Sequence, residues 1–333
     1  MKLTSTADVD ALEVAYLSSA ALNTAVELGL FWNLAQKPQT ASQIAVALNI
    51  PIQRCRAWLN LLLDLGLLDK DNETYTVSSL ARAAILDGHS QATESFLAWH
   101  RRAYYGGGTN LTLYVHHPGS VWEAQGQSTP DDYHFMKENP VWAEQFTRML
   151  HEIHEPFAVQ VAEIVEMTGV HRMADLGGGS GVMSFALLRR YPNLTSVVVD
   201  LENVCIVGRE LAAANGLAER VTYFPADLLR DDLPLGFDLV MQCGVGIYSV
   251  EYLRKVSQVL TQGGRLLIIQ HLVQPDGSTT IPATEMFRRT LVNGNYSLWT
   301  LADMQQMLTA AGFEFASQQT LSSGEWLVEA HRR

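Results

Sequence analysis

The stretch Ala174-Asp175-Leu176-Gly177-Gly178-Gly179-Ser180-Gly181 decides how the fold of this chain is interpreted. Residues 170–173 before it favour a short strand, and residues 182–188 after it have helical spacing without a breaker. We therefore predict a glycine turn that leads from a strand into a helix. Glycine suits such a turn because it tolerates a positive φ and lets a ligand approach the backbone. The free N–H groups at the start of the helix then bind the polar end of that ligand.

Two acidic residues follow this turn, each near the end of a predicted strand. Residues 196–199 are typical of a buried strand that ends at Asp200, and residues 221–224 form a second one before Asp227. A carboxylate at the first position can accept hydrogen bonds from both hydroxyls of a ribose, and one at the second can accept from an exocyclic amine. Val182 stands where the dinucleotide motif needs a small residue, and no Lys follows to make a P-loop.

This order of glycine turn, acid and acid resembles the class I S-adenosylmethionine-dependent methyltransferases. Four sequence features make the resemblance specific to one family within this class. They are the runs D-L-G-G-G-S-G at 175–181, V-V-V-D-L at 197–201 and A-D-L-L at 226–229, and the glycine pair 263–264. They look like the plant and bacterial small-molecule O-methyltransferase family, which includes caffeate and acetylserotonin O-methyltransferases. The resemblance covers roughly residues 10–333. It implies an enzyme that methylates a small aromatic or polycyclic metabolite, with S-adenosylmethionine as cofactor.

The resemblance also implies which residues hold the cofactor. Asp175 and the turn glycines would bind its methionine end, Asp200 with Leu201 its ribose, and Asp227 with Leu228 its adenine. Gln242 falls where family members often place a Lys that meets the cofactor. The predicted glycines are Gly177, Gly178, Gly179 and Gly181.

Length and composition limit the function classes. A chain of 333 residues with 47% hydrophobic and 17% charged residues can bury two sizeable cores. Its formal net charge of −12 disfavours nucleic acid and anionic membranes as partners. The 3 cysteines are scattered and lack metal-ligand spacing, so we expect reduced thiols in a cytoplasmic protein. No apolar run approaches the ~18 residues of a membrane span, and the start has no signal-peptide core.

Residues 1–90 have the pattern of a winged helix-turn-helix domain. A helix pair over 8–36 precedes a short helix after Thr40, a helix over 51–66, and a two-stranded wing near 66–68 and 75–77. Such a module binds DNA or forms dimers. Phosphate contact needs several cations on one face, and the helix over 51–66 carries only Arg54 and Arg56, partly balanced by Asp64. The resembled family uses this module to form an intertwined dimer that closes the partner's pocket, which implies a homodimer.

Residues 91–160 are expected to be helical and are rich in aromatic residues, with a break at Gly106–Gly108. By resemblance this connector roofs the substrate pocket, and Tyr105, Met149 and His151 are its candidate substrate-binding residues. His151 and His154 could face a metal from one helix face, but no further ligand set is visible, so we predict no metal.

Residues 161–333 alternate strand and helix, which predicts a parallel, doubly wound sheet. The complete prediction is an α/β chain: a Rossmann-like class I methyltransferase domain after a mainly helical winged-helix dimerisation domain. The expected strands lie near 172–176, 196–200, 221–224, 237–242, 265–271, 313–319 and 325–331, with helices at 181–191, 203–216, 250–261 and 301–311.

The chain departs from the family after the fourth strand of this domain. Family members usually carry His-Asp-Trp there, and the His accepts the proton of the substrate hydroxyl. An ungapped count places Gly246 at that His and Tyr248 at the Trp. The candidates for another base are Tyr248, His271 and Glu285.

Other interpretations of the missing His remain open. The acceptor can be a carbon, a nitrogen or an acidic hydroxyl, none of which needs a strong base. The chain can also bind S-adenosylmethionine for a reaction other than methyl transfer. From a different class, a winged-helix regulator that senses S-adenosylmethionine is the rival hypothesis.

Overall fold

The computed structural model describes residues 2–108, 110–129, 132–274, 276–293 and 298–333, without the side chains of residues 100, 102–108 and 132. The chain forms two compact units, residues 1–110 and 111–333. The region predicted as one connector over 91–160 is divided between these two units. No helix in the described part of the chain has the length and apolarity needed to cross a membrane.

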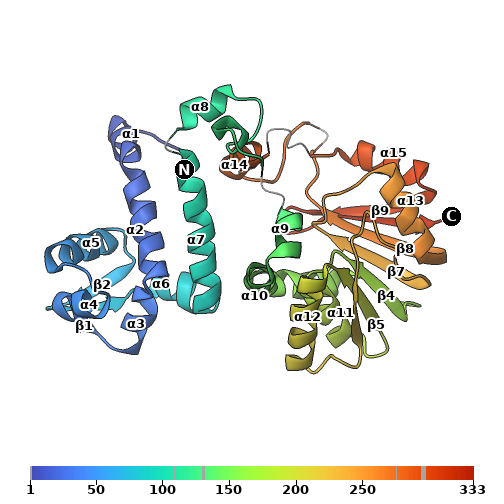
Figure 1. Cartoon of the computed structure of the whole chain (residues 1–333), viewed down its shortest axis with the longest axis horizontal. Helices are drawn as coiled ribbons and strands as arrows, with labels where there is room; N and C mark the ends of the chain where they lie inside the picture. The colour runs from blue at the N-terminus through green and yellow to red at the C-terminus, as the bar shows by residue number, and fades with distance from the viewer. Residues whose placement is uncertain (1, 109, 130–131, 275, 294–297) are drawn as a thin grey trace. The chain divides into compact units, whose positions relative to one another are not determined.

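The first unit is mainly helical and contains one small antiparallel sheet (Figure 1). Strands β2 and β3 form a hairpin, and β1 pairs with the other edge of β3. Its elements are α1 (Thr6–Glu13), α2 (Ala15–Glu27), α3 (Leu30–Gln36), β1 (Gln39–Thr40), α4 (Ala41–Ala47), α5 (Ile52–Asp64), β2 (Leu68–Asp71), β3 (Thr74–Val77), α6 (Ser79–Ala81), the π-helical turn η1 (Arg82–Leu86) and α7 (Gln91–Gly108).

Local sequence signals set the boundaries in this unit. Thr40 caps α4 and exchanges hydrogen bonds with Gln43, as a capping box does. Pro51 precedes α5, and Cys55 on that helix lies in the core with residues of α2, α3 and β3. The glycines at 106–108 do not interrupt a helix as expected; they are the last residues of α7.

The second unit is built on a seven-stranded sheet with the order β6-β5-β4-β7-β8-β10-β9 (Figure 1). The first five strands of that order are parallel, and β10 runs antiparallel to both β8 and β9. This arrangement fits the predicted doubly wound sheet with a terminal reversed hairpin. The strands are β4 (Arg172–Leu176), β5 (Thr195–Asp200), β6 (Val221–Pro225), β7 (Phe237–Cys243), β8 (Leu260–Gln270), β9 (Phe313–Thr320) and β10 (Trp326–Arg332).

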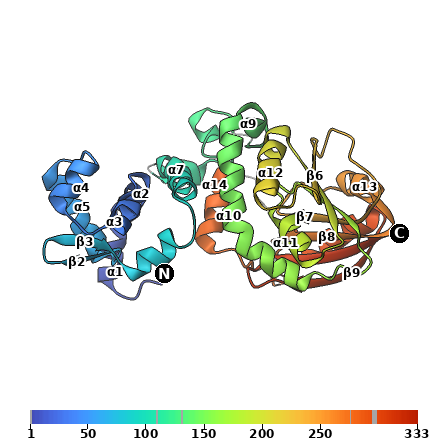
Figure 2. The same cartoon turned by 90° about the horizontal axis from the view of Figure 1, so that it is seen from below.

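Helices cover both faces of this sheet because successive strand residues point to opposite sides. Met173 packs with α10 and α11, whereas Ala174 packs with α13 and α15. Figure 2 shows α10 alongside α11 and α12. The helices are α8 (Leu111–His116), the 3₁₀ turn η2 (Glu123–Gln125), α9 (Asp132–Glu138), α10 (Pro140–Ile164), α11 (Val182–Arg190), α12 (Glu202–Ala214), α13 (Val250–Val259), α14 (Ala283–Val292) and α15 (Leu301–Ala310).

Three features of the second unit were not predicted. Helix α14 occupies 283–292, where no helix was expected although the apolar residues at 283, 286, 287 and 291 have helical spacing. Helix α10 continues through Pro156 over 25 residues. Strand β8 begins at Leu260, earlier than expected, because Leu260 pairs with Phe237 and the register then shifts before Leu239.

Candidate active site

The predicted glycine turn lies at the carboxyl end of β4. Gly181 is the N-cap of α11 with φ +83°, and a Cβ there would stand 2.7 Å from the hydroxyl of Tyr223. A Cβ at Gly178 would stand 2.5 Å from the carboxyl carbon of Asp175. A side chain at Gly178 would therefore fill the space beside the Asp175 carboxylate, whereas one at Gly181 would collide with Tyr223.

Asp175 contributes a carboxyl group that is only partly satisfied. One oxygen accepts a hydrogen bond of 2.8 Å from the Ser184 hydroxyl, and the other is buried with no partner in the described structure. Burial raises the pKa of Asp175 to about 6. An unpartnered buried acceptor of this kind is matched by a ligand that brings a hydrogen-bond donor or a positive charge.

Asp200 and Asp227 are fixed by backbone N–H groups. The two oxygens of Asp200 accept from Gly179 N at 2.8 Å and Leu201 N at 2.7 Å, and burial raises its pKa. Asp227 Oδ1 accepts from the N–H groups of Leu229 and Arg230 at 3.0 and 3.2 Å. Each oxygen of Asp200 has a second lone pair, and Oδ2 of Asp227 takes no part in these two N–H bonds, so both groups can still accept from a ligand.

These carboxylates line one cavity of about 810 Å³. The predicted residues that line it are Asp175, Gly177, Gly178, Gly179, Asp200, Asp227, Leu228 and His271. Residues that the sequence did not single out complete the wall, among them Tyr133, Leu150, Phe157, Met183, Cys243, Val245, Ile247, Arg289 and Glu325.

Three predicted cofactor residues lie next to this wall and do not line it. Leu201 is buried and takes part through its N–H group, and Gly181 caps α11. Gln242 is fully buried and donates a hydrogen bond to the hydroxyl of Tyr252 on α13, away from the cavity. Its neighbour Cys243 lines the cavity, because adjacent residues of a strand face opposite sides of the sheet.

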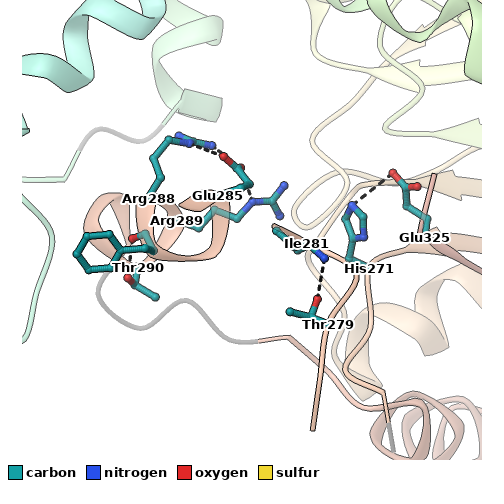
Figure 3. Close-up of polar contacts among 9 residues, drawn as sticks. His271, Thr279, Ile281, Glu285, Arg288, Arg289, Thr290 and Glu325 are labelled. Carbon is teal, nitrogen blue, oxygen red and sulfur yellow. Dashed lines mark hydrogen bonds and ion pairs between the residues drawn. The ribbon is translucent and has the colours of Figure 1, made fainter. Parts of the chain in front are cut away.

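The three candidate bases lie in different environments. Tyr248 is buried edge-on against Trp299 with centroids 5.5 Å apart, and burial raises its pKa well above the usual value. Among the residues that the structure describes, its hydroxyl has no hydrogen-bond partner, and Tyr248 does not line the cavity. Glu285 is bound by Arg288 and Arg289 at 2.7 Å (Figure 3), and these bonds lower its pKa to about 2. Of the three, His271 is the one on the cavity wall.

The two substrate-binding candidates on α10, Met149 and His151, do not line the cavity. Met149 is buried, and His151 Nδ1 lies 3.0 Å from the Ser180 hydroxyl with its ring edge-on to Phe185. Burial lowers the pKa of His151. The same helix lines the cavity through Leu150, His154 and Phe157. The Tyr105 side chain lies outside the described residues. Within the described residues there is no cluster of three or more His, Cys, Asp or Glu that could hold a metal ion.

Two wall residues that the sequence did not indicate have clear partners. Tyr133 on α9 forms a hydrogen bond with Asp227, and burial raises its pKa. Glu325, just before β10, lies 3.4 Å from His271 Nε2 (Figure 3). An isolated Tyr or Glu carries no local signal, and only the sheet order brings β8 and the start of β10 together.

Comparison with protein families decides the assignment. Residues 115–314 match the O-methyltransferase domain, and residues 12–86 match the O-methyltransferase dimerisation domain. The chain belongs to the O-methyltransferase family. Members of this family are S-adenosylmethionine-dependent methyltransferases that act on small metabolites, and this chain is therefore such an enzyme.

Two curated relatives and one solved structure illustrate the similarity of this O-methyltransferase to known proteins. The chain is 28% identical to N,N-dimethyltransferase OxyT of Streptomyces rimosus, covering 96% of this chain and 94% of the relative. It is 29% identical to 3-hydroxy-5-methyl-1-naphthoate 3-O-methyltransferase of Streptomyces sahachiroi, covering 87% and 84%. The fold matches that of mitomycin 7-O-methyltransferase MmcR with a TM-score of 0.83, 24% identity and coverage of 98% and 97%.

The cofactor of the family is S-adenosylmethionine, and its polar groups match the residues that line the cavity. The unpartnered oxygen of Asp175 can accept from its amino group, and the glycine turn leaves room beside that oxygen. Asp200 and Asp227 present carboxylate oxygens to the same cavity. When bound, the cofactor supplies an electrophilic methyl group on a positively charged sulfur.

Proposed function

We propose that this O-methyltransferase homologue transfers the methyl group to a hydroxyl of an aromatic or polycyclic metabolite. The proposal rests mainly on the observation that the carboxylates of Asp175, Asp200 and Asp227 line the same cavity as His271. Much of the remaining wall is apolar, with Leu150, Phe157, Met183, Val245 and Ile247. A volume of about 810 Å³ lies at the upper end of the range for small-molecule sites, so the cavity suits a cofactor together with a flat acceptor.

Each carboxylate has a proposed part in holding the cofactor. Asp175 and the turn glycines bind the methionine end, Asp200 binds the ribose, and Asp227 binds the adenine amine. Leu228 lies at the wall beside Asp227, where an apolar side chain packs against a ring face. The chain itself then orders donor and acceptor and excludes water, which are the main contributions to a methyl transfer.

The first test is calorimetric binding of S-adenosylmethionine and of its demethylated product. We expect micromolar binding of both to the wild type. The Asp200→Ala variant should bind at least about 30-fold more weakly, because it loses charge-assisted hydrogen bonds to the ribose. The matched control is Asp69→Ala on the exposed face of β2. No binding by the folded wild type would remove the proposed function.

The acceptor atom is tested with a panel of hydroxynaphthoates, aromatic amines and activated carbon acceptors, read by mass spectrometry. A methyl group added to hydroxyls supports the proposal. Nitrogen methylation is the second candidate, because one relative that covers nearly the whole chain is an N,N-dimethyltransferase. Products methylated only on nitrogen or carbon would contradict oxygen as the acceptor.

We further propose that the enzyme is a cytoplasmic homodimer. The match to a dimerisation domain supports dimer formation, and the three unpaired cysteines, Cys55, Cys205 and Cys243, support a reducing compartment.

Helices α4 and α5 and the hairpin β2–β3 have the element order of a winged helix. The exposed side of α5 offers Arg54 and Arg56, which is few cations for a DNA-binding regulator. The test is a gel-shift assay with genomic DNA fragments. Absence of salt-sensitive binding in the micromolar range agrees with a role in dimer formation rather than DNA binding.

A further inference from the structure

Helix α14 carries a cluster of three charged residues. Arg288 binds Glu285 through two hydrogen bonds of 2.7 Å, from Nε to Oε2 and from Nη2 to Oε1. Arg289 donates from its Nε to Glu285 Oε1, also at 2.7 Å. The bonds with Arg288 and Arg289 lower the pKa of Glu285 to about 2, so this carboxylate is ionised at neutral pH. Because two cations surround one anion, the cluster has a net positive charge.

Of the three residues, Arg289 lines the cavity. Its side chain is 30% exposed. Figure 3 shows its guanidinium extending from α14 towards His271, with Arg288 on the other side of Glu285. The helix therefore presents one guanidinium to the cavity and uses the other to hold the carboxylate between them.

The wall that Arg289 shares with His271 is separate from the residues proposed to hold the ribose. Asp200 ends β5, whereas His271 follows β8. In the order β6-β5-β4-β7-β8 these two strands are three strand spacings apart, which is roughly 14 Å. The side of the cavity at β8 is thus the side available to the acceptor molecule.

Among the described lining residues, Arg289 is the permanent cation on this side of the cavity. The other lining residues with a permanent positive charge are Lys137 and Arg230. Lys137 belongs to α9, which contacts Asp227 through Tyr133, and Arg230 Nε lies 3.8 Å from Asp227. Both therefore lie on the side proposed for the adenine.

Glu325 is the carboxylate on the same side as Arg289, and its charge is directed at the protein. Its Oε1 lies 3.4 Å from His271 Nε2, and its Oε2 is buried. Burial raises the pKa of the neighbouring Cys243 thiol to about 12, so this group is neutral. A ligand on this wall therefore meets the positive charge of Arg289.

We propose that the acceptor molecule carries a carboxylate and that Arg289 binds it. This rests on the proposed methylation of an aromatic metabolite. A guanidinium has five N–H donors and matches the two oxygens of a carboxylate in a bidentate pair. Arg289 can thus contact Glu285 through Nε and the acceptor through its terminal nitrogens. Glu285 is a positioning residue, because its bond to Nε orients the guanidinium before a ligand binds.

Acceptor binding can be measured without methyl transfer. The measurement is calorimetry on the full-length protein saturated with S-adenosylhomocysteine, the demethylated product. The three probes are a hydroxynaphthoate, its carboxamide and the naphthol without the carboxyl group. We expect the wild type to bind the carboxylate about 10- to 100-fold more tightly than either neutral compound, as hydrogen bonds between charged groups do. Equal affinities for the three, or binding of none of them, would overturn the proposal.

Variants of α14 assign the preference for the carboxylate to one residue. Arg289→Gln should reduce this preference to about threefold or less. Arg289→Lys keeps the charge but loses the planar fork, so it should retain part of the preference. The matched control is Arg288→Gln, which removes the same charge from the next residue of the helix and should keep a preference of about tenfold or more. Equal losses in Arg289→Gln and Arg288→Gln would contradict the assignment to Arg289.

Turnover and cofactor binding complete the test. Arg289→Gln should raise the KM of the hydroxynaphthoate and leave the KM of the naphthol unchanged. Its calorimetric affinity for S-adenosylmethionine should equal that of the wild type, since Asp200 is distant from Arg289. Intact cofactor binding without any carboxylate preference overturns the role of Arg289 alone, whereas a wild type that does not bind the cofactor overturns the proposed function.

Discussion

At the residue scale, the site combines groups whose environments favour different charge states. Asp175 is buried with one unpartnered oxygen, and its pKa is raised to about 6. Glu285 is bound by two arginines, and its pKa is lowered to about 2. A carboxyl group that is costly to ionise and lies in a cavity is typical of a ligand site, whereas one held by arginines is typical of a structural ion pair.

Asp175 should therefore lower the stability of the ligand-free protein at neutral pH. Its folded-state pKa of about 6 lies above the usual 3.8, so the favourable contribution of the protonated form is complete below about pH 4 and is lost as the pH rises through 6. About two pKa units correspond to an effect of order 3 kcal/mol. We expect Asp175→Asn without cofactor to melt several degrees higher than the wild type at pH 7.5.

Calorimetric melting across pH provides the check on Asp175. The difference between Asp175→Asn and the wild type should shrink towards pH 4.5, and the variant should bind S-adenosylmethionine more weakly throughout. A melting difference that does not depend on pH would show that the carboxylate charge is not its cause. Ser184 can donate to an Asn oxygen as it does to Asp175, so the variant keeps that contact.

At the element scale, α9 is held over the cofactor side of the cavity by two sets of contacts. Tyr133 forms a hydrogen bond with Asp227. Asn203 Nδ2, at the start of α12, donates to the carbonyls of Met136 and Lys137, each at 2.9 Å. These carbonyls belong to the last turn of α9 and would otherwise lack helical partners.

We expect Tyr133→Phe to weaken S-adenosylmethionine binding by about 3- to 10-fold, since one hydrogen bond that orients Asp227 is lost. Asn203→Ala should increase the dissociation rate of the cofactor, because α9 then loses its anchor to α12. Stopped-flow fluorescence measures the association and dissociation rates of the cofactor for both variants. The control is Asn215→Ala, at the opposite end of α12. A dissociation rate for Asn203→Ala equal to that of the control would contradict this role of α9.

The sequence predicted the strands of the second unit because their apolar runs end in recognisable turns. Every expected strand has a counterpart, and Asp175, Asp200 and Asp227 line one cavity because parallel strands end at the same edge. It was harder to predict from the sequence which face of its strand or helix a single side chain occupies. Gln242 faces α13 while Cys243 faces the cavity, and on α10 the wall residue is Leu150 rather than Met149. A shift of one residue changes the face, and tertiary packing sets it.

At the scale of the whole molecule, the dimerisation domain requires a surface for a second copy. Helices α1 and α2 expose Leu12, Tyr16 and Leu17, each at least half accessible in the single chain. Such a group of exposed apolar residues is typical of an interface. We expect light scattering to give twice the mass of one chain, and Leu12→Asp with Leu17→Asp to give a monomer.

The control for this prediction is Val46→Asp, which introduces the same charge at a residue of α4 that is 83% exposed. It should leave the dimer intact. A wild-type monomer would contradict the homodimer, and dissociation by Val46→Asp alone would move the interface to α4.

The loop after β7 has a consequence for how this enzyme can change by mutation. Gly244 and Gly246 both have a positive φ, of 66° and 70°. A Cβ at Gly246 would meet no neighbour within 4 Å, so space for a side chain exists and the backbone conformation is the obstacle. A histidine there would cost of order 1–2 kcal/mol. A single substitution of Gly246 by histidine is thus unfavourable, and placing a base at this position requires the loop backbone to change as well.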